Sequence, residues 1–482
     1  MAGFRLWIGA SAADTLTRLS VQLISTMVVA RILSAEEFGL ASMVLGVNTV
    51  MAAFIGMPFE ESLAQRRRLL GTHLETALYV STVLAVLAVA LSAVFGPLIE
   101  HAAHAPGFAA ALVVSSLLLF AQGPGAVAKA MARRQRRFVD LAICNALSTV
   151  IGCGLAVLAA MAGWGIYALI LQRLLPNVFY PVLAAILLKL HGQRIWVPIR
   201  WHGERFRELF RFSWLNLADV GVSSASPAIL AFLVNGYFGQ AVLGQLNIAL
   251  RVVEPLRMAM LGAGHNLAFS VMVRLQSDAQ RLTARAGDIV AGTGFVVVPA
   301  FIGLGVSAPV LLPALVGPGW DQSVPLAQIL CLAVAFSLPF RFYYSGYSAL
   351  GRPEYGLISS TLAIAVMAMT FVIFSWFGLH ITSGIAYAAY EATTVVVALT
   401  IAGRILGRAM MAAIARLIRI WIGALIMAAA VHWLYLTGPE PAISASARLS
   451  AIILSGAVIY PLVMLILCPQ CLRDGLRLIR NR

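Results

Sequence analysis

Long apolar segments follow one another along almost the whole chain, and they constrain its fold more than any other feature. A helix needs about 20 mostly apolar residues to cross the hydrocarbon layer of a bilayer. About fourteen segments satisfy this length; they are residues 6–32, 39–63, 75–99, 107–130, 139–162, 164–190, 209–234, 243–267, 288–316, 322–348, 355–377, 380–403, 415–436 and 447–468. Membrane barrels alternate apolar and polar residues along each strand, and these segments do not. The predicted fold is therefore an all-α integral membrane protein.

The composition supports the same class. Of the 482 residues 61% are hydrophobic and 11% are charged, whereas soluble domains carry about 25% charged residues. The net charge of +15 would suit nucleic acid, but the basic residues form short clusters between apolar segments. That placement is typical of membrane topology, and we exclude nucleic acid as a partner.

The distribution of basic residues predicts that both termini lie in the cytoplasm. With the N-terminus there, the cytoplasmic loops hold the clusters Arg66–Arg68, Lys129–Arg137 and Lys189–Arg211, while the external loops hold only Arg448. Cytoplasmic loops of membrane proteins carry an excess of Lys and Arg. One miscounted helix would invert every later loop, so this asymmetry supports the whole count.

A weak internal repeat predicts two similar halves. Glu36–Gly39 is similar to Ala241–Gly244, and Gly165-Ile166 is similar to Gly384-Ile385, in the same order along the chain. We expect an N-terminal six-helix bundle at 1–190, a cytoplasmic linker at 191–208, a C-terminal six-helix bundle at 209–403, and two additional helices with a basic tail at 404–482. Parallel repeats are a common plan of transporters, with the substrate bound between the halves.

Charged residues inside the predicted spans are the candidate functional residues. A charge at the centre of a membrane helix costs roughly 2.5–3.5 kcal/mol, so it nearly always faces a protein interior or water. The basic candidates are Arg18, Arg173, Arg251, Arg257 and Arg341, and the acidic ones are Asp14, Glu61, Asp219, Glu254 and Glu391.

Two interpretations of these charges stay open. In the first they form structural pairs, because Asp14 and Arg18 are four residues apart and Glu254 is three from both Arg251 and Arg257. In the second the arginines line a cationic cavity, since guanidinium groups bind phosphate oxygens in a bidentate way.

Features of catalytic proteins are missing from the sequence. There is no GxxxxGK[ST] nucleotide loop, no Asp-x-Asp pair, and no external loop long enough for a catalytic domain. His101 and His104 follow Glu100 in an external loop, where we favour a plain polar loop over a metal site. We therefore expect a transporter rather than an enzyme, with no metal and no cofactor.

Several segments resemble one known family. Ala30–Leu40, of sequence ARILSAEEFGL, resembles the first-loop signature of polysaccharide biosynthesis (Wzx-type) flippases. Gly351–Tyr355, Trp376–Gly378 and Gly384–Ala386 resemble that family's eleventh and twelfth helices. The family belongs to the MOP superfamily, together with lipid II flippases and MATE drug exporters. Where members often have Gly-x-x-Gly-Ala-Ala, this chain has Gly378-Leu-His-Ile-Thr-Ser-Gly384.

The resemblance implies a MATE-like fold and a function. It implies a multi-pass flippase of the bacterial inner membrane that moves undecaprenyl-pyrophosphate-linked oligosaccharide units by alternating access, for surface or exopolysaccharide biosynthesis. The five arginines would hold the pyrophosphate or an acidic sugar, and the five carboxylates are the candidates for coupling to protons or sodium. Membrane lipids, a polysaccharide polymerase and a chain-length regulator are the expected partners.

Three alternatives remain at this point. A MATE-like exporter of organic cations should have an anionic cavity, and the five arginines against five acids argue modestly against it. A lipid II flippase would differ only in cargo. A membrane glycan polymerase or ligase is disfavoured by the short external loops.

Overall fold

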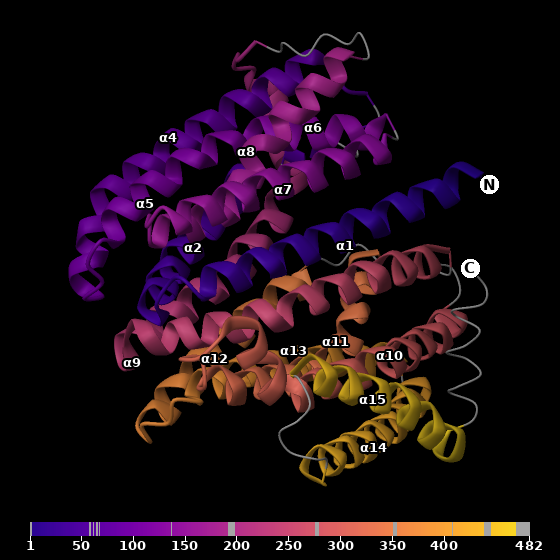
Figure 1. Cartoon of the computed structure of the whole chain (residues 1–482). Coiled ribbons are helices and arrows are strands. Elements are labelled where there is room, and N and C mark those ends of the chain that lie inside the picture. The colour runs from indigo at the N-terminus through magenta and orange to yellow at the C-terminus, as the bar shows by residue number, and fades with distance from the viewer. Residues whose placement is uncertain are drawn as a thin grey trace. The chain divides into compact units, whose positions relative to one another are not determined.

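The computed structural model describes residues 2–468 except 57–58, 61, 64–65, 67, 136, 191–197, 275–278, 350–353, 407 and 438–444. Within these residues the chain forms fourteen α-helices and one short 3-10 helix, and no strand. The helices group into two compact units, Met1–Asn247 (unit 1) and Ile248–Arg482 (unit 2), and Figure 1 shows the helices of each.

Unit 1 is built from α-helices, most of which are long enough to span a membrane. They are α1 (Ala2–Ala30), α2 (Ala35–Ile55), α4 (Gly71–Ala102), α5 (Phe108–Leu117), α6 (Gln122–Arg134), α7 (Phe138–Met161) and α8 (Ile166–Leu190). The 3-10 helix Leu118–Ala121 joins α5 to α6, so that the two together form one apolar span, Phe108–Arg134. Helix α7 packs against α1 and α8, and α4 packs against α5.

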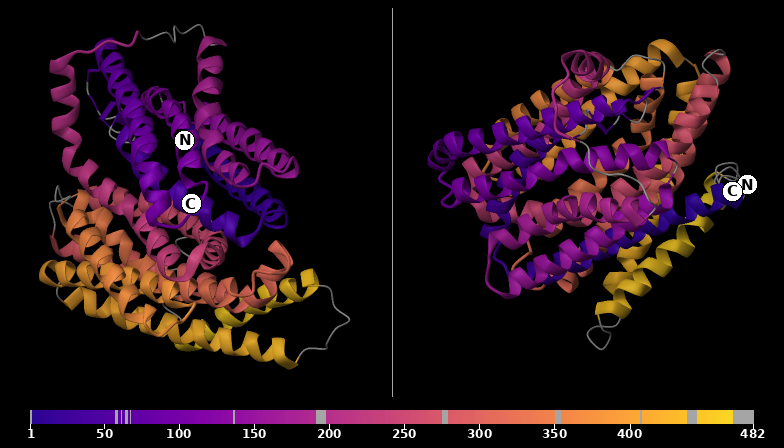
Figure 2. Two further views of the ribbon diagram at one scale, coloured as in Figure 1. Left: turned by 90° about the vertical axis from the view of Figure 1, so that its left-hand side faces the viewer. Right: turned by 90° about the horizontal axis from the view of Figure 1, so that it is seen from above.

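Helix α9 (Gly203–Arg274) begins in unit 1 and ends in unit 2. Unit 2 continues with α10 (Ala279–Val316), α11 (Ser323–Ala349), α12 (Glu354–Ser375), α13 (Thr382–Leu406), α14 (Arg408–Thr437) and α15 (Ala445–Leu467). Helix α13 packs against both α11 and α12, while α10 packs against α11, α14 and α15. The last two helices, α14 and α15, lie side by side, as Figure 2 shows in yellow.

Glycines lie at the end of α2 and at a break inside α9. Helix α2 ends at Ile55, where Gly56 is its C-cap, and residues 59–60 and 62–63 of the span expected at 39–63 are helical again beyond it. Pro58 follows two residues on, and proline interrupts helical hydrogen bonding. The helices expected at 209–234 and 243–267 meet directly inside α9, where Gly239 has φ 82° and ψ 175°. Glycine adopts such positive φ values without the strain that a Cβ atom causes.

Most helices are long and apolar enough to cross a membrane. Eleven segments of the described residues meet this description, and one of them, Leu217–Leu261, is 45 residues long and contains the break at Gly239. Such a segment exceeds the roughly 20 residues that one crossing needs. The protein is therefore an all-α, multi-pass membrane protein.

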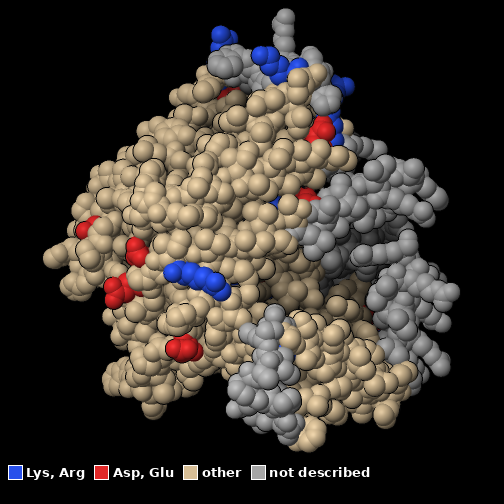
Figure 3. Space-filling model, in the orientation of Figure 1, with Lys and Arg blue, Asp and Glu red and all other residues tan. Residues whose placement is uncertain are grey.

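One end of unit 1 is basic and polar. Most of the Lys and Arg side chains visible in Figure 3 lie at the top of the view, near the end of α8 and the beginning of α9 in Figure 1. There Arg66 Nη1 donates to Glu208 Oε2 over 2.6 Å, and His73 Nε2 lies 3.1 Å from the same oxygen. The hydrogen bonds from His73 and Arg66 lower the pKa of Glu208 to about 2. Glu208 is therefore ionised at neutral pH.

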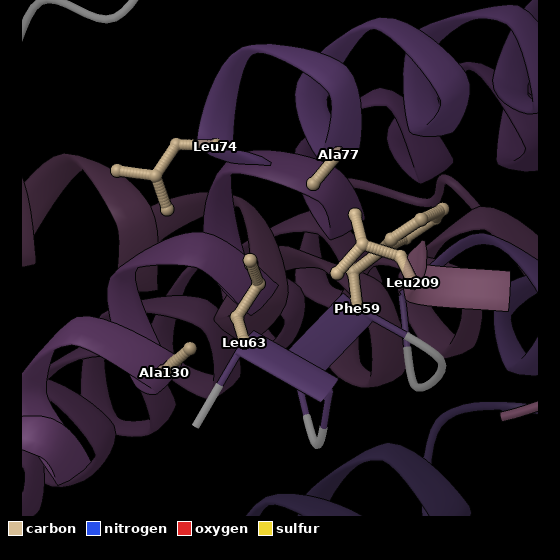
Figure 4. Packing of buried hydrophobic residues seen from close by; sticks show 6 residues of the cluster. All are labelled: Phe59, Leu63, Leu74, Ala77, Ala130 and Leu209. Atoms are coloured by element: carbon tan, nitrogen blue, oxygen red, sulfur yellow. The ribbon is translucent and has the colours of Figure 1, made fainter. Parts of the chain in front are cut away.

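A small apolar core supports this polar network. Six buried residues pack together in Figure 4, namely Phe59, Leu63, Leu74, Ala77, Ala130 and Leu209. They come from the segment between α2 and α4, from α4, from α6 and from the first turns of α9. The beginning of α9 is thus anchored to unit 1 by both apolar packing and ion pairs.

Candidate functional site: a buried ion cluster in unit 2

Glu391 lies at the centre of a buried cluster of charges in unit 2. Its side chain, on α13, has 0% exposure. Arg341 on α11 donates through Nη2 to both carboxylate oxygens, over 2.9 Å each. Arg257 on α9 approaches the same carboxylate, with its Nη2 3.2 Å from Oε1. One carboxylate therefore joins three helices.

A second carboxylate completes the cluster. Glu254 lies one turn before Arg257 on α9 and accepts a hydrogen bond from Arg257 Nη1. The hydroxyl of Tyr387, on α13, accepts a hydrogen bond from Arg257 Nη1 over 3.0 Å and donates to Glu254 Oε1 over 3.1 Å. Arg257 therefore lies between two carboxylates, and Tyr387 bridges it to one of them.

The charges of the cluster balance, but its two sides differ. A buried ion is tolerated only when it is paired and hydrogen-bonded, and two arginines here face two glutamates. Glu391 is fully buried, whereas the side chain of Glu254 is 29% exposed. The buried Nε atoms of Arg257 and Arg341 have no hydrogen-bond partner among the described residues. Each guanidinium thus keeps an N–H donor that an added anion could use.

For the other six predicted residues the structure gives an ion pair or an exposure, or leaves the residue outside the part of the chain that it describes. In unit 1, Arg18 pairs with Asp14 along α1 over 3.3 Å, with 45% of the arginine side chain exposed. Arg173 on α8 is exposed, and Asp219 and Arg251 on α9 are half-buried. Glu61 lies outside the described residues. The structure therefore brings four of the ten candidates together: Arg257, Arg341, Glu254 and Glu391.

Sequence reasoning missed two sets of residues. Tyr387 precedes Glu391 by four positions, which places both on one face of a helix, so this spacing was a usable signal. The network of Arg66, His73 and Glu208 joins residues more than 130 positions apart, and no local pattern announces it.

Glu100, next to the histidines considered for a metal, has a structural role. Its carboxylate accepts hydrogen bonds from the backbone N–H groups of Gly107 over 3.2 Å and Ala109 over 2.8 Å, and so caps the start of α5. No group of three or more His, Cys, Asp or Glu suited to a metal ion occurs in the part of the chain that the structure describes.

The fold has clear counterparts among solved structures. The lipid II flippase MurJ in an inward closed conformation is similar with a TM-score of 0.70 and 14% sequence identity, over 96% of this chain and 98% of MurJ. An inward-facing MATE-family multidrug transporter of the MOP superfamily has a TM-score of 0.60 and 14% identity, over 84% of this chain and 98% of that one. The class is therefore that of multi-pass membrane proteins with the MurJ and MATE fold.

The chain belongs to the polysaccharide biosynthesis protein family, whose model matches residues 28–325. It is 21% identical to the lipopolysaccharide biosynthesis protein WzxC of Escherichia coli K12 over 326 residues, which is 67% of this chain and 65% of WzxC. It is 24% identical to the succinoglycan biosynthesis transport protein ExoT of Rhizobium meliloti over 406 residues, covering 77% of this chain and 78% of ExoT. The family model is described as a polysaccharide biosynthesis protein, and of the two relatives ExoT is named a transport protein.

Proposed function

We propose that this protein is a flippase that moves undecaprenyl-pyrophosphate-linked oligosaccharide units across the bacterial inner membrane by alternating access. Family membership supports a role in polysaccharide biosynthesis, and the relatives WzxC and ExoT are named for lipopolysaccharide and succinoglycan biosynthesis. A lipid-linked sugar has an apolar tail that stays in the bilayer and a charged head that needs help to cross it.

We propose the orientation that places both termini in the cytoplasm. The basic end of unit 1 then faces the cytoplasm, in keeping with the excess of Lys and Arg on that side of membrane proteins. The loops at the other end lie together: Glu37 lies against Gly165, and Asn235 donates to the carbonyl of Ala103 over 2.8 Å. The two six-helix halves, 1–190 and 209–403, and the two additional helices remain predictions from the sequence repeat.

The observation that carries the cargo assignment is the pair of buried arginines around Glu391. Arg257 and Arg341 are held by a carboxylate that cannot reach solvent, and each keeps a free Nε–H. A pyrophosphate offers several oxygens to such donors, and guanidinium binds phosphate in a bidentate way. We propose that Glu391 keeps the arginines in place and that the cargo's phosphate replaces the partly exposed Glu254 at Arg257. Arg18, Arg173 and Arg251 complete the proposed set of cargo-binding arginines.

We also propose which carboxylate couples cargo movement to protons or sodium. A proton or sodium ion that neutralises Glu254 would weaken its hold on Arg257 and free that guanidinium for an anion. Glu254 is therefore our first choice among the candidate carboxylates, ahead of Asp14, Glu61, Asp219 and Glu391.

Flipping can be tested with purified protein in proteoliposomes that carry an undecaprenyl-pyrophosphate oligosaccharide with a labelled sugar. The active transporter makes the labelled head accessible to an enzyme added on the opposite side of the membrane, and Arg257→Gln with Arg341→Gln abolishes this. Accessibility equal to that of protein-free vesicles contradicts the proposal.

Three parallel assays test the alternative functions. Rescue of cells depleted of their lipid II flippase would identify lipid II as the cargo. Export of a fluorescent organic cation, lost on Asp219→Asn, would identify a drug exporter. Growth of glycan chains by the purified protein would identify a polymerase.

A further inference from the structure

One oxygen atom of the ion cluster in unit 2 is held by two donors at once. Glu254 Oε1 accepts a hydrogen bond from Arg257 Nη1 and another, over 3.1 Å, from the hydroxyl of Tyr387. The two donors also contact each other, since Arg257 Nη1 lies 3.0 Å from the Tyr387 oxygen. A guanidinium group of α9 and a phenol of α13 therefore converge on a single point, and a negatively charged oxygen occupies it.

The two donors are held more firmly than the oxygen that they bind. The side chain of Arg257 is 11% exposed and is also paired with the fully buried Glu391, whereas the side chain of Glu254 is 29% exposed. A carboxylate that already reaches solvent can turn outward and be hydrated there. Its departure leaves two adjacent donors without an acceptor, and a buried donor without an acceptor is costly. The point therefore favours another anionic oxygen whenever Glu254 leaves it.

Arg257 also has a donor in reserve. Its Nη1 binds Glu254 and Tyr387 and its Nη2 faces Glu391, but its buried Nε has no hydrogen-bond partner among the described residues. An incoming ligand with several anionic oxygens can use such a donor, whereas a single carboxylate in the position of Glu254 does not. This difference favours a phosphate or a pyrophosphate over a simple carboxylate.

We propose that Tyr387 is a cargo-binding residue. Its hydroxyl and Arg257 Nη1 form an anion position that Glu254 occupies between transport cycles and that a phosphate oxygen of the cargo occupies when Glu254 turns away. The inference deepens the proposed function and rests on it, because that proposal makes the cargo a pyrophosphate. The phenol is a neutral donor, so it strengthens the hold on phosphate without adding a buried charge that needs its own partner.

A direct contact and a merely supporting role of Tyr387 predict opposite results. If the hydroxyl binds the cargo, Tyr387→Phe removes one donor and weakens anion binding. If the hydroxyl only keeps Glu254 on Arg257, the same change loosens the competing carboxylate and strengthens anion binding. The phenylalanine ring keeps the packing of the tyrosine ring in both cases, so the sign of the effect separates the two roles.

The first experiment measures the binding of inorganic pyrophosphate to the purified full-length protein by titration calorimetry. We expect Tyr387→Phe to raise the dissociation constant about tenfold, as the loss of one hydrogen bond to a charged group does. Glu254→Ala removes the competitor and should lower the dissociation constant severalfold. Adding Tyr387→Phe to Glu254→Ala should raise it again by a similar factor.

Tyr460→Phe is the matched control for the loss of a phenol. Tyr460 is also buried in unit 2, and its hydroxyl donates to the carbonyl of Phe295 over 3.0 Å. This variant loses a comparable hydrogen bond outside the ion cluster, so its dissociation constant for pyrophosphate should equal that of the native protein.

A second experiment keeps the hydroxyl in place. Fluorotyrosine is incorporated at position 387 alone, and its fluorine resonance is followed by NMR while pyrophosphate is added. We expect the resonance to shift and to saturate at the concentrations that saturate the calorimetric signal. Fluorotyrosine at position 460 should give a resonance that does not move. This measurement does not depend on the folding of any Tyr387 variant.

Each outcome has a distinct meaning. If Tyr387→Phe leaves binding unchanged or tightens it, or if the resonance at position 387 does not move at saturation, Tyr387 does not bind the cargo, although the cargo assignment to Arg257 and Arg341 stands. If neither the native protein nor Glu254→Ala binds pyrophosphate, the anion position and the inference are both overturned. If pyrophosphate binds as expected but the proteoliposomes show no flipping, the proposed function fails while the role of Tyr387 in anion binding stands.

Discussion

Glu391→Gln is the most informative single change, because it removes charge from the cluster while keeping shape. The amide still accepts a hydrogen bond from Arg341, but Arg257 and Arg341 are left with one carboxylate, Glu254, between them. Their contacts with Glu391 measure 2.9 and 3.2 Å. Removing one partner of a buried ion pair typically costs about 3–5 kcal/mol, since the other charge stays buried without compensation.

We therefore expect Glu391→Gln to lower the free energy of unfolding by about 3–5 kcal/mol. Glu254→Gln is the matched control on the exposed side of the cluster, where solvent compensates the charge, and should cost about 1 kcal/mol. Both values can be measured by denaturation in mixed detergent micelles, with the loss of helical circular dichroism as the signal.

A double variant separates charge from packing. Arg341→Gln in the Glu391→Gln background removes the uncompensated cation, so the double variant should be more stable than Glu391→Gln alone. We expect a coupling energy of about 2 kcal/mol between the two positions. If Glu391→Gln unfolds within about 0.5 kcal/mol of the native protein, charge balance does not hold α9, α11 and α13 together, and the reasoning is wrong.

Three further predictions concern other parts of the chain. Arg18→Ala and Arg251→Ala should leave protein levels near normal and reduce surface polysaccharide; unchanged export by both single variants and by the double would remove them from the cargo site. Because the folded pKa of Glu208 is about 2 and its ordinary value is 4.5, its stabilising contribution is complete above pH 4.5 and is lost as the pH falls through about 2. The difference in melting temperature between the native protein and Glu208→Gln should thus be the same at pH 7 and pH 5.5. A melting-temperature difference that shrinks between these two pH values would contradict the lowered pKa of Glu208. Ser34→Ala removes the capping box of α2 and should cost about 1 kcal/mol, seen as faster hydrogen exchange in the first turn of α2; unaltered exchange there would count against the cap.

The helices and the membrane class follow from sequence alone, because burying an apolar segment in lipid requires only local composition. Hydropathy predicted fourteen spans, of which eleven candidate spans are found in the described residues, and the local spacing of Glu254 and Arg257 indicated their pairing. The end of α2 at Ile55 was not predicted, because the apolar segment continues past Gly56, where hydropathy does not mark a helix boundary.

The assembled site could not be read from the sequence for a different reason. Arg341 and Glu391 are fifty positions apart, and only the packing of α11 against α13 brings them together. Contacts between segments distant in the chain depend on how helices pack, and this is a property of many residues at once.

Helix α9 has a mechanical consequence, because the boundary between the two compact units falls inside it and not in a loop. The segment of α9 that follows the break at Gly239 carries both Leu243, near the end of unit 1, and Glu254, in unit 2. Glu254 and Arg257 lie about four to five turns beyond Gly239 along this helical segment, so the direction in which the two charged side chains point depends on how the segment is wound.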